Sequence, residues 1–230
     1  MTLEPKDILY EDNHVIVVNK RAGEPVQADP TGDLPLEERV KAYIKKKYNK
    51  PGNVFLGIVH RIDRPVSGAV IFAKTSKALV RLNEQLRQRS LGKVYWAIVE
   101  KLPAEPAGEL RHYISRDPKK NRSTALDKPR DDAKEAVMKY RTVKSGDRYH
   151  LLEVELITGR HHQIRAQLSK IGTPIKGDLK YGAARSNPDG GISLHARSIT
   201  FPHPVTREMV TATAPVPAND NLWEYMQREG

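Results

Sequence analysis

The sequence of 230 residues contains no cysteine. This absence excludes disulfide bonds, thiolate catalysis, iron–sulfur clusters and zinc sites built on sulfur. Aromatic residues are scarce, at 6% of the chain. No apolar run approaches the roughly 20 residues that a membrane-spanning helix needs. Residues 1–13 include acidic side chains and lack an apolar segment. We therefore expect no secretory signal, no membrane partner and a cytoplasmic protein.

The composition is otherwise that of a soluble globular protein, with 38% hydrophobic and 29% charged residues. A chain of this length buries roughly 70% of the surface that its unfolded form exposes, so it can form a full core without cross-links. Its charge is unbalanced, because 39 Lys and Arg residues against 28 Asp and Glu residues give a net charge of +11. A field of that sign attracts polyanions, which favours a nucleic-acid partner over a charge that serves solubility alone.

One stretch, residues 111–148, concentrates this charge. It carries 12 basic and 6 acidic residues and is interrupted by Pro118 and Pro129. We interpret its backbone as a solvated excursion between strands, and its charge as suited to phosphate contacts.

Five segments have the β-branched and aromatic composition of strands and are bounded by Gly, Pro, Asn or Asp. They are residues 14–19, 68–73, 93–99, 151–156 and 193–201. Because strands and helices alternate without a strict βαβ rhythm, we predict an α+β (mixed α/β) fold. Its central sheet is expected to be largely antiparallel and flanked by helices, in one catalytic domain over residues 1–230. A domain of this size with no apolar surplus is expected to be a monomer.

Three segments have the apolar spacing of helices. The first has Ser76 as its expected N-cap and leucines at 79, 82 and 86, and it ends before Gly92. The second covers residues 36–48. The third covers residues 161–170 and is stopped by Gly172.

Two segments carry residue types that are typical of catalysis. In residues 57–68, Pro65 disfavours a helical conformation for Arg64, so Asp63 is expected on a loop before a buried strand. Arg61 and Arg64 favour the ionised carboxylate of Asp63, which suits it as a nucleophile or base. A structural ion pair is the alternative interpretation of Asp63.

The second segment, residues 156–165, is expected to run from a strand through Thr158-Gly159 into a helix. A helix N-terminus favours an anion, and Arg165 is spaced to share a helix face with His161 and His162. A metal site on the histidines is disfavoured, because the spacing is wrong for a helical pair of ligands and the arginines would repel a cation. A Ser-His-Asp hydrolase is weaker still, since no G-x-S-x-G motif occurs.

Together these segments resemble the RluA-type RNA pseudouridine synthases. Residues 60–68 (H-R-I-D-R-P-V-S-G) and 72–75 (F-A-K-T) are similar to one family block, and residues 158–165 (T-G-R-H-H-Q-I-R) are similar to another. The resemblance continues in order through residues 9–23, 171–182 and 194–206, which is nearly the whole chain. The departures are Ile62 where Leu is frequent, Lys20-Arg21 where Lys-Pro is frequent, and His161 where Thr is frequent. The N-terminal S4-type RNA-binding module of many members is expected to be absent.

The resemblance implies an isomerase that converts uridine within RNA to pseudouridine, without metal or cofactor, in a cleft across the sheet. It implies that Asp63 is the catalytic carboxylate, that Tyr95 stacks on the uracil, and that Arg165 pairs with the carboxylate. Arg61 corresponds to a position that enters the helical stack as the target base leaves it. The remaining candidates for substrate binding are His60, Arg64, Arg160, His162 and Gln163.

The sequence does not name the target uridine, so rRNA and tRNA both stay open as partners. Two other classes of protein compete with this interpretation. One is a non-catalytic RNA-binding or assembly factor that retains the fold, and the other is a basic metal-dependent hydrolase.

Overall fold

The computed structural model describes residues 3–218 and 220–228 of the chain. The chain divides into two compact units. The first comprises residues 1–91 and 196–217, and the second comprises residues 92–195 and 218–230. The single catalytic domain over residues 1–230 stays a prediction.

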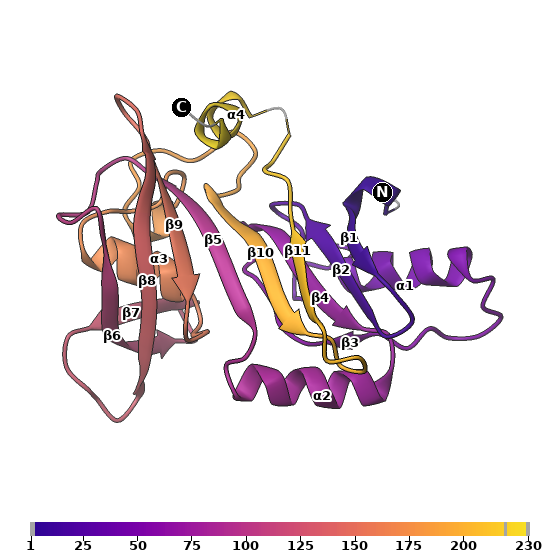
Figure 1. Ribbon diagram of the computed structural model, residues 1–230. Helices are drawn as coiled ribbons and strands as arrows, with labels where there is room; N and C mark the ends of the chain where they lie inside the picture. The colour runs from indigo at the N-terminus through magenta and orange to yellow at the C-terminus, as the bar shows by residue number, and fades with distance from the viewer. Residues whose placement is uncertain (1–2, 219, 229–230) are drawn as a thin grey trace. The chain divides into compact units, whose positions relative to one another are not determined.

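The first unit is built on neighbouring strands in the order β1, β2, β4 and β10 (Figure 1). Two further strands extend this arrangement, because β3 pairs with β4 and β11 pairs with β10. The pairs β1–β2, β2–β4, β3–β4 and β10–β11 are all antiparallel. The strand bounds are β1 (Ile8–Glu11), β2 (Val15–Lys20), β3 (Gly57–Ile58), β4 (Ser67–Ala73), β10 (Leu194–Pro202) and β11 (Met209–Thr213).

The core of this unit forms because β2 and β4 are apolar on both faces. Val17 pairs with Ile71 in the register, and both belong to a buried cluster with Phe201 of β10. Helix α2 (Ser76–Arg87) contributes Ala78 and Leu82 to the same cluster. The short 3-10 helix η1 (Pro5–Asp7) precedes β1, and helix α1 (Leu36–Lys47) follows β2. Helix α1 buries three apolar side chains. These are Leu36, Val40 and Ile44.

The start of α2 corrects the sequence prediction. The N-cap is Thr75, whose side chain accepts a hydrogen bond from the Ala78 backbone N–H at 3.2 Å, and Ser76 is the first helical residue. Both residue types are good caps, so composition alone does not distinguish two adjacent hydroxyl side chains. The extended backbone of Thr75 places its hydroxyl over the first turn.

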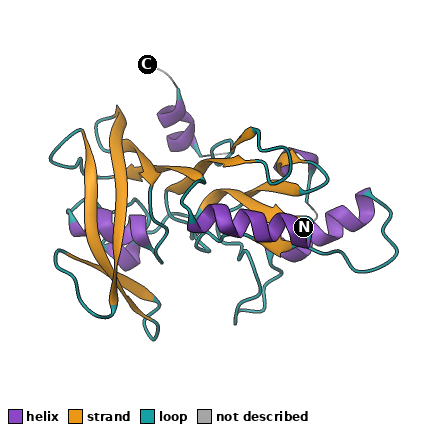
Figure 2. Cartoon of the chain, turned by 60° about the horizontal axis from the view of Figure 1, so that its bottom comes forward, coloured by secondary structure: helices purple, strands orange, loops and turns teal. Residues whose placement is uncertain are grey.

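The second unit is a strand ladder in the order β5, β9, β8, β6 and β7, and every pair in it is antiparallel. Helix α3 buries Ala166 against Ile114 of β6 and Ala125 of β7. Helix α4 contributes buried Trp223 and Met226. Figure 2 distinguishes the helices from the strands by colour. The bounds are β5 (Gly92–Val99), β6 (Ala107–Asp117), β7 (Arg122–Leu126), β8 (Ala133–Ser145), β9 (His150–Leu156), α3 (Gln163–Lys170), η2 (Leu179–Tyr181) and α4 (Asn221–Gln227).

The sequence suggested that the basic stretch 111–148 is an irregular excursion between strands. That prediction is wrong. Most of it lies in β6, β7 and β8. Strand β6 pairs with β7 and with β8, and β8 pairs with β9. The alternation of exposed and buried residues in β8 explains the error. Glu135, Lys139 and Arg141 share one face of the strand, and these charges mask the buried Ala136, Met138 and Tyr140 on the other.

The third predicted helix also begins later than expected. Residues 161 and 162 precede α3, and His162 is its N-cap in a left-handed conformation, with φ 52° and ψ 27°. The helical spacing expected between the two histidines and Arg165 therefore does not exist. No helix in the described part of the chain combines the length and the apolar character needed to cross a bilayer.

Candidate active site

The loop that carries Asp63 lies between β3 and β4 in the first unit, as the sequence predicts. A turn closes it, in which the Val66 N–H donates to the Asp63 carbonyl at 3.0 Å. The Asp63 side chain is half-buried. Because Ser67 directly follows the turn and begins a strand that is buried throughout, the loop is fixed at this end.

Gly68 allows this strand to start where it does. Its φ is +113°, and a Cβ added there would lie 2.3 Å from the Ala196 carbonyl oxygen of β10. Any side chain would therefore clash with a neighbouring backbone, in a conformation that L residues avoid. The requirement for glycine five residues after Asp63 is steric.

A buried lysine holds the other side of the loop. The Lys20 side chain is 1% exposed, and Lys20 pairs with Gly68 in the register of β2 and β4. Its Nζ donates to the carbonyls of Arg21 at 2.9 Å, Glu24 at 2.7 Å and Arg64 at 3.0 Å. The Gly23 N–H donates to the same Arg64 carbonyl at 2.8 Å. Three donors on one ammonium match three carbonyls, so Lys20 ties residues 21–24 to the residue after Asp63.

The charge of Lys20 is sensitive to its surroundings. Burial lowers the pKa of Lys20 to about 7, against the attraction of the Glu24 and Asp63 carboxylates, which raises it. Lys20 therefore interacts electrostatically with the Asp63 carboxylate and also holds the backbone of the next residue, Arg64.

The other predicted residues of this segment have different environments. Arg64 is engaged by the segment 29–33, because it pairs with Asp33 and donates to Thr31 Oγ1 at 2.7 Å. His60 Nε2 accepts from the Ile71 N–H of β4 at 3.3 Å. Arg61 is exposed and has no hydrogen bond or ion pair to another residue that the structure describes.

In the second unit, Tyr95 lies on β5 opposite Val154 of β9 and is 7% exposed. Lys93 shares its face of the strand, two residues away. Burial lowers the pKa of Lys93, and no carboxylate opposes this effect. The Lys93 Nζ lies against Gly159, where an added Cβ would be 3.3 Å from it. The Gly159 segment therefore sits beside the strand that carries Tyr95.

Gln163 organises the turn that leads into α3. Its Oε1 accepts from the Thr158 hydroxyl at 2.8 Å and from the Arg160 N–H at 2.9 Å. Its Nε2 donates to the Val137 carbonyl at 3.1 Å, and the side chain is 2% exposed. The Arg160 Nε donates to the Glu135 carbonyl at 2.9 Å. Gln163, which sequence reasoning grouped with the substrate-binding candidates, is thus also the internal fastener of this turn.

Arg165 is held by a buried carboxylate. Its Nε and Nη2 donate to the two oxygens of Asp178 at 2.7 and 2.8 Å. The side chains are 6% and 1% exposed. The Arg165 guanidinium also lies 4.9 Å from the centroid of the Tyr181 ring. Two of its five N–H donors serve Asp178, so the plane of the guanidinium is fixed.

His162 is a neutral base at physiological pH. Burial lowers its pKa to about 2, assisted by the positive charges of Arg165, Lys180 and Arg116 and by His161. Its Nδ1 lies 2.9 Å from the Tyr181 hydroxyl. Within residues 3–218 and 220–228, no three His, Asp or Glu side chains gather in a way that could hold a metal ion.

Sequence reasoning missed the roles of Lys20, Asp178 and Tyr181. The sequence does mark Lys20, because it is a lysine at the end of an apolar strand, after residues 15–18 and Asn19. No local signal exists for Asp178, whose partner lies 13 residues earlier in the chain.

Solved human structures define the class of fold. RNA pseudouridylate synthase domain containing 4 aligns with a TM-score of 0.79 at 25% identity, over 96% of this chain and 92% of that chain. RNA pseudouridylate synthase domain containing 1 aligns with a TM-score of 0.69 at 21% identity, over 100% and 98% of the two chains. The fold is that of the pseudouridine synthases, and the predicted α+β class is confirmed.

The sequence comparisons are more specific. The pattern of the RNA pseudouridylate synthase family matches residues 14–170. An uncharacterized RNA pseudouridine synthase of Synechocystis is 34% identical over 97% of this chain and 70% of its own length. Ribosomal large subunit pseudouridine synthase D of Xanthomonas campestris is 35% identical, over 93% of this chain and 66% of its own length. The chain thus spans about two thirds of the length of these relatives. It belongs to the RNA pseudouridylate synthase family, a family of isomerases, as its sequence predicts.

Proposed function

We propose that the protein isomerises specific uridines in structured RNA, rRNA or tRNA, to pseudouridine, with Asp63 as the catalytic carboxylate. In this reaction the bond from N1 to C1′ breaks, the uracil turns, and C5 bonds to C1′. The C5 proton leaves and N1 gains a proton, so atoms balance without an oxidant or reductant. The proposed enzyme acts in the cytoplasm as a monomer, without metal or cofactor.

The observation that carries the proposal is the fixed position of the Asp63 loop. The turn to Val66, the Lys20 contacts and the requirement for Gly68 each restrict the backbone beside this carboxylate. A reacting group gains most when its position is set before substrate binds, because the cost of ordering it is not incurred in the transition state. Ordinary surface aspartates have no such support.

Tyr95 and Arg165 are proposed to act on the same uridine. Tyr95 offers an aromatic ring on a buried strand, which suits stacking on a uracil. Arg165 has a guanidinium whose plane is fixed by Asp178, which suits it to orient a carboxylate.

The target nucleotide is proposed to leave the helical stack before it reacts. Unstacking and unpairing cost a few kcal/mol, which a residue that fills the vacated space offsets. Arg61 is suited to this role because it is exposed and next to the Asp63 loop. His60, Arg64, Arg160, His162 and Gln163 are retained as proposed substrate-binding residues. For Arg64 and Gln163 the internal contacts favour an indirect role, through the segments that they hold.

The decisive experiment measures tritium release from RNA labelled at C5 of uridine, with total rRNA and total tRNA as separate substrates. We expect release by the wild type and by Glu38→Ala. Glu38→Ala removes an exposed carboxylate of the same unit and serves as the matched control. We expect no release by Asp63→Ala, which should still bind RNA within a few fold because the charge it loses is negative.

Normal release by Asp63→Ala would refute its catalytic role. RNA binding by the wild type without release from either RNA pool would favour the non-catalytic RNA-binding or assembly factor.

A further inference from the structure

The turn between β6 and β7 carries cations that form no ion pair with a carboxylate of residues 3–218 or 220–228. Arg116 is the second-last residue of β6, Arg122 begins β7, and Lys180 of η2 lies against the turn. All three side chains are exposed. None of them forms an ion pair with any residue in the described ranges. We call residues 116–122 with Lys180 the cationic turn.

Contacts among these residues make the cationic turn one structure. The Lys180 Nζ donates to the Asn121 carbonyl at 3.0 Å, and Asn121 itself has a positive φ of 45°. The Arg122 guanidinium lies 5.3 Å from the centroid of the Tyr181 ring. The turn is therefore fastened to η2 at its tip and at its second strand.

A pair of histidines forms the floor beside the turn. The rings of His161 and His162 stack with centroids 3.8 Å apart and an interplanar angle of 22°. His161 Nδ1 lies 2.8 Å from the Ser123 hydroxyl, and its Nε2 lies 3.2 Å from Asn121 Oδ1. His161 thus joins the β7 end of the turn to the segment before α3.

The electrostatic surroundings of this floor are positive. After burial, the groups that lower the pKa of His162 most are Arg165, His161, Lys180 and Arg116. Two nearby acids are already engaged. Asp178 holds Arg165, and Asp117 accepts from the Lys120 N–H at 3.1 Å. The cations of the turn would attract an anion from outside the chain.

We propose that the cationic turn binds phosphodiester groups of the RNA substrate. This would be an RNA contact in addition to the one proposed at the Asp63 loop. The guanidinium groups of Arg116 and Arg122 match phosphate oxygens in pairs, and Lys180 adds a point charge. Residues 117–122 (D-P-K-K-N-R) contain no large apolar side chain, which disfavours an inserted membrane contact or an apolar protein interface. The identity of the polyanion as RNA rests on the proposed function.

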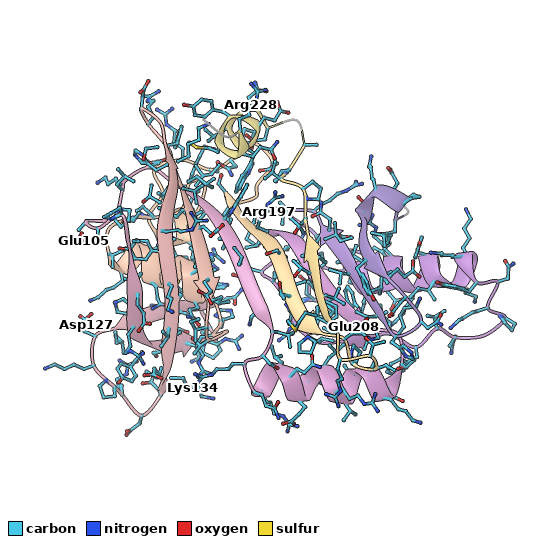
Figure 3. All side chains as sticks on the ribbon, in the orientation of Figure 1. Glu105, Asp127, Lys134, Arg197, Glu208 and Arg228 are labelled. Atoms are coloured by element: carbon cyan, nitrogen blue, oxygen red, sulfur yellow. The ribbon has the colours of Figure 1, made fainter. Side chains whose placement is uncertain are left out.

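The test compares two double variants that lose the same charge. Arg116→Gln with Lys180→Gln alters the cationic turn. Lys41→Gln with Lys170→Gln is the control, because those lysines are paired with Glu38 and Asp127. Asp127 is labelled in Figure 3, and its side chain is 68% exposed. Both variants are made in the Asp63→Ala background, so that binding of a labelled stem-loop RNA is measured without turnover.

We expect the turn variant to bind roughly tenfold more weakly or worse at 0.1 M salt, and the slope of log affinity against log salt to fall by about 1 to 2. The control should stay within about twofold. Equal losses in the two variants would overturn the proposal, because net charge alone would then explain them. Unchanged binding in the turn variant would overturn it as well.

Two further measurements separate the outcomes. Thermal melting of both variants excludes misfolding, and the single variant Arg116→Gln, which removes no internal hydrogen bond of the described chain, must show part of the effect. Anionic phospholipid vesicles and polyglutamate are tested in parallel, and a turn-dependent contact with either in place of RNA would overturn the proposal. If the wild type releases no tritium but the turn variant still loses RNA affinity, the proposed function fails and the RNA contact stands.

Discussion

The two units stabilise a buried cation in different ways. In the first, Lys20 is met by three backbone carbonyls from residues 21, 24 and 64. In the second, Arg165 is met by both oxygens of one carboxylate, that of Asp178. An ammonium shared among carbonyls orders several backbone segments at once, whereas a bidentate carboxylate fixes the plane of one guanidinium. The first unit thereby fixes a loop, and the second fixes a side chain.

The largest effect is expected from Asp178→Asn. The Arg165 guanidinium then loses the buried carboxylate that fixes its plane, and breaking a buried pair in this way typically costs about 3–5 kcal/mol. We expect the free energy of unfolding in urea to fall by about 3 kcal/mol, together with a loss of tritium release. The control is Asp127→Asn, whose exposed pair with Lys170 is worth about 1 kcal/mol or less. A loss no greater than that of the control would mean that the buried carboxylate is not what holds Arg165.

A pH-dependent effect is expected from Lys20→Met. Burial holds the pKa of Lys20 at about 7 in the folded state, whereas an unfolded lysine titrates near 10.4. The unfolded chain therefore binds more protons between these values, so the penalty of burying the charge is complete below pH 7 and is relieved as pH rises. Relative to Lys20→Met, the wild type should gain about 3 kcal/mol of unfolding free energy between pH 7 and pH 10.

Urea unfolding of both proteins at each pH unit from 7 to 10 measures this difference directly. A constant difference would show that Lys20 keeps an ordinary pKa. The carbonyl contacts would then compensate burial fully, and the contrast with Arg165 would be smaller than the structure indicates.

The smallest effect is expected from Arg64→Gln. Its side chain is 39% exposed and pairs with Asp33 and, at 3.6 Å, with Asp29. Exposed pairs of this kind contribute about 1 kcal/mol or less. We expect thermal melting to change little, while the carbonyl of residue 64 keeps its bond to Lys20. If Arg64→Gln proved more destabilising than Lys20→Met at pH 10, side-chain pairing rather than the carbonyl contacts would hold the Asp63 loop.

The fold was predictable where burial was written into composition. Strands β2, β4, β5 and β9 are apolar on one or both faces, so their residues announce them. The ladder of β6, β7 and β8 was missed because its solvent face is dense with charge. The start of α3 was missed because His162 adopts a left-handed conformation, which is uncommon for a residue other than glycine.

The candidate site divides in the same way. Asp63, Tyr95 and Arg165 were named from family motifs, and the loop around Asp63 followed from Pro65 and Gly68. The contacts of Lys20 with Arg64 and of His162 with Tyr181 join residues 44 and 19 positions apart. Such partners are chosen by the packing of the whole unit, so no local pattern specifies them.

The first unit is interrupted in the sequence, because residues 92–195 of the second unit stand between its two parts. Strand β4 has β10 as a neighbour, and the absence of a side chain at Gly68 leaves room for the backbone of Ala196. During synthesis from the N-terminus, β4 and the Asp63 loop therefore wait without this neighbour until more than a hundred further residues have been made. Strands β10 and β11 join the first unit only after residues 92–195 have been made. The nascent chain consequently lacks the strand beside the Asp63 loop until most of its translation is over.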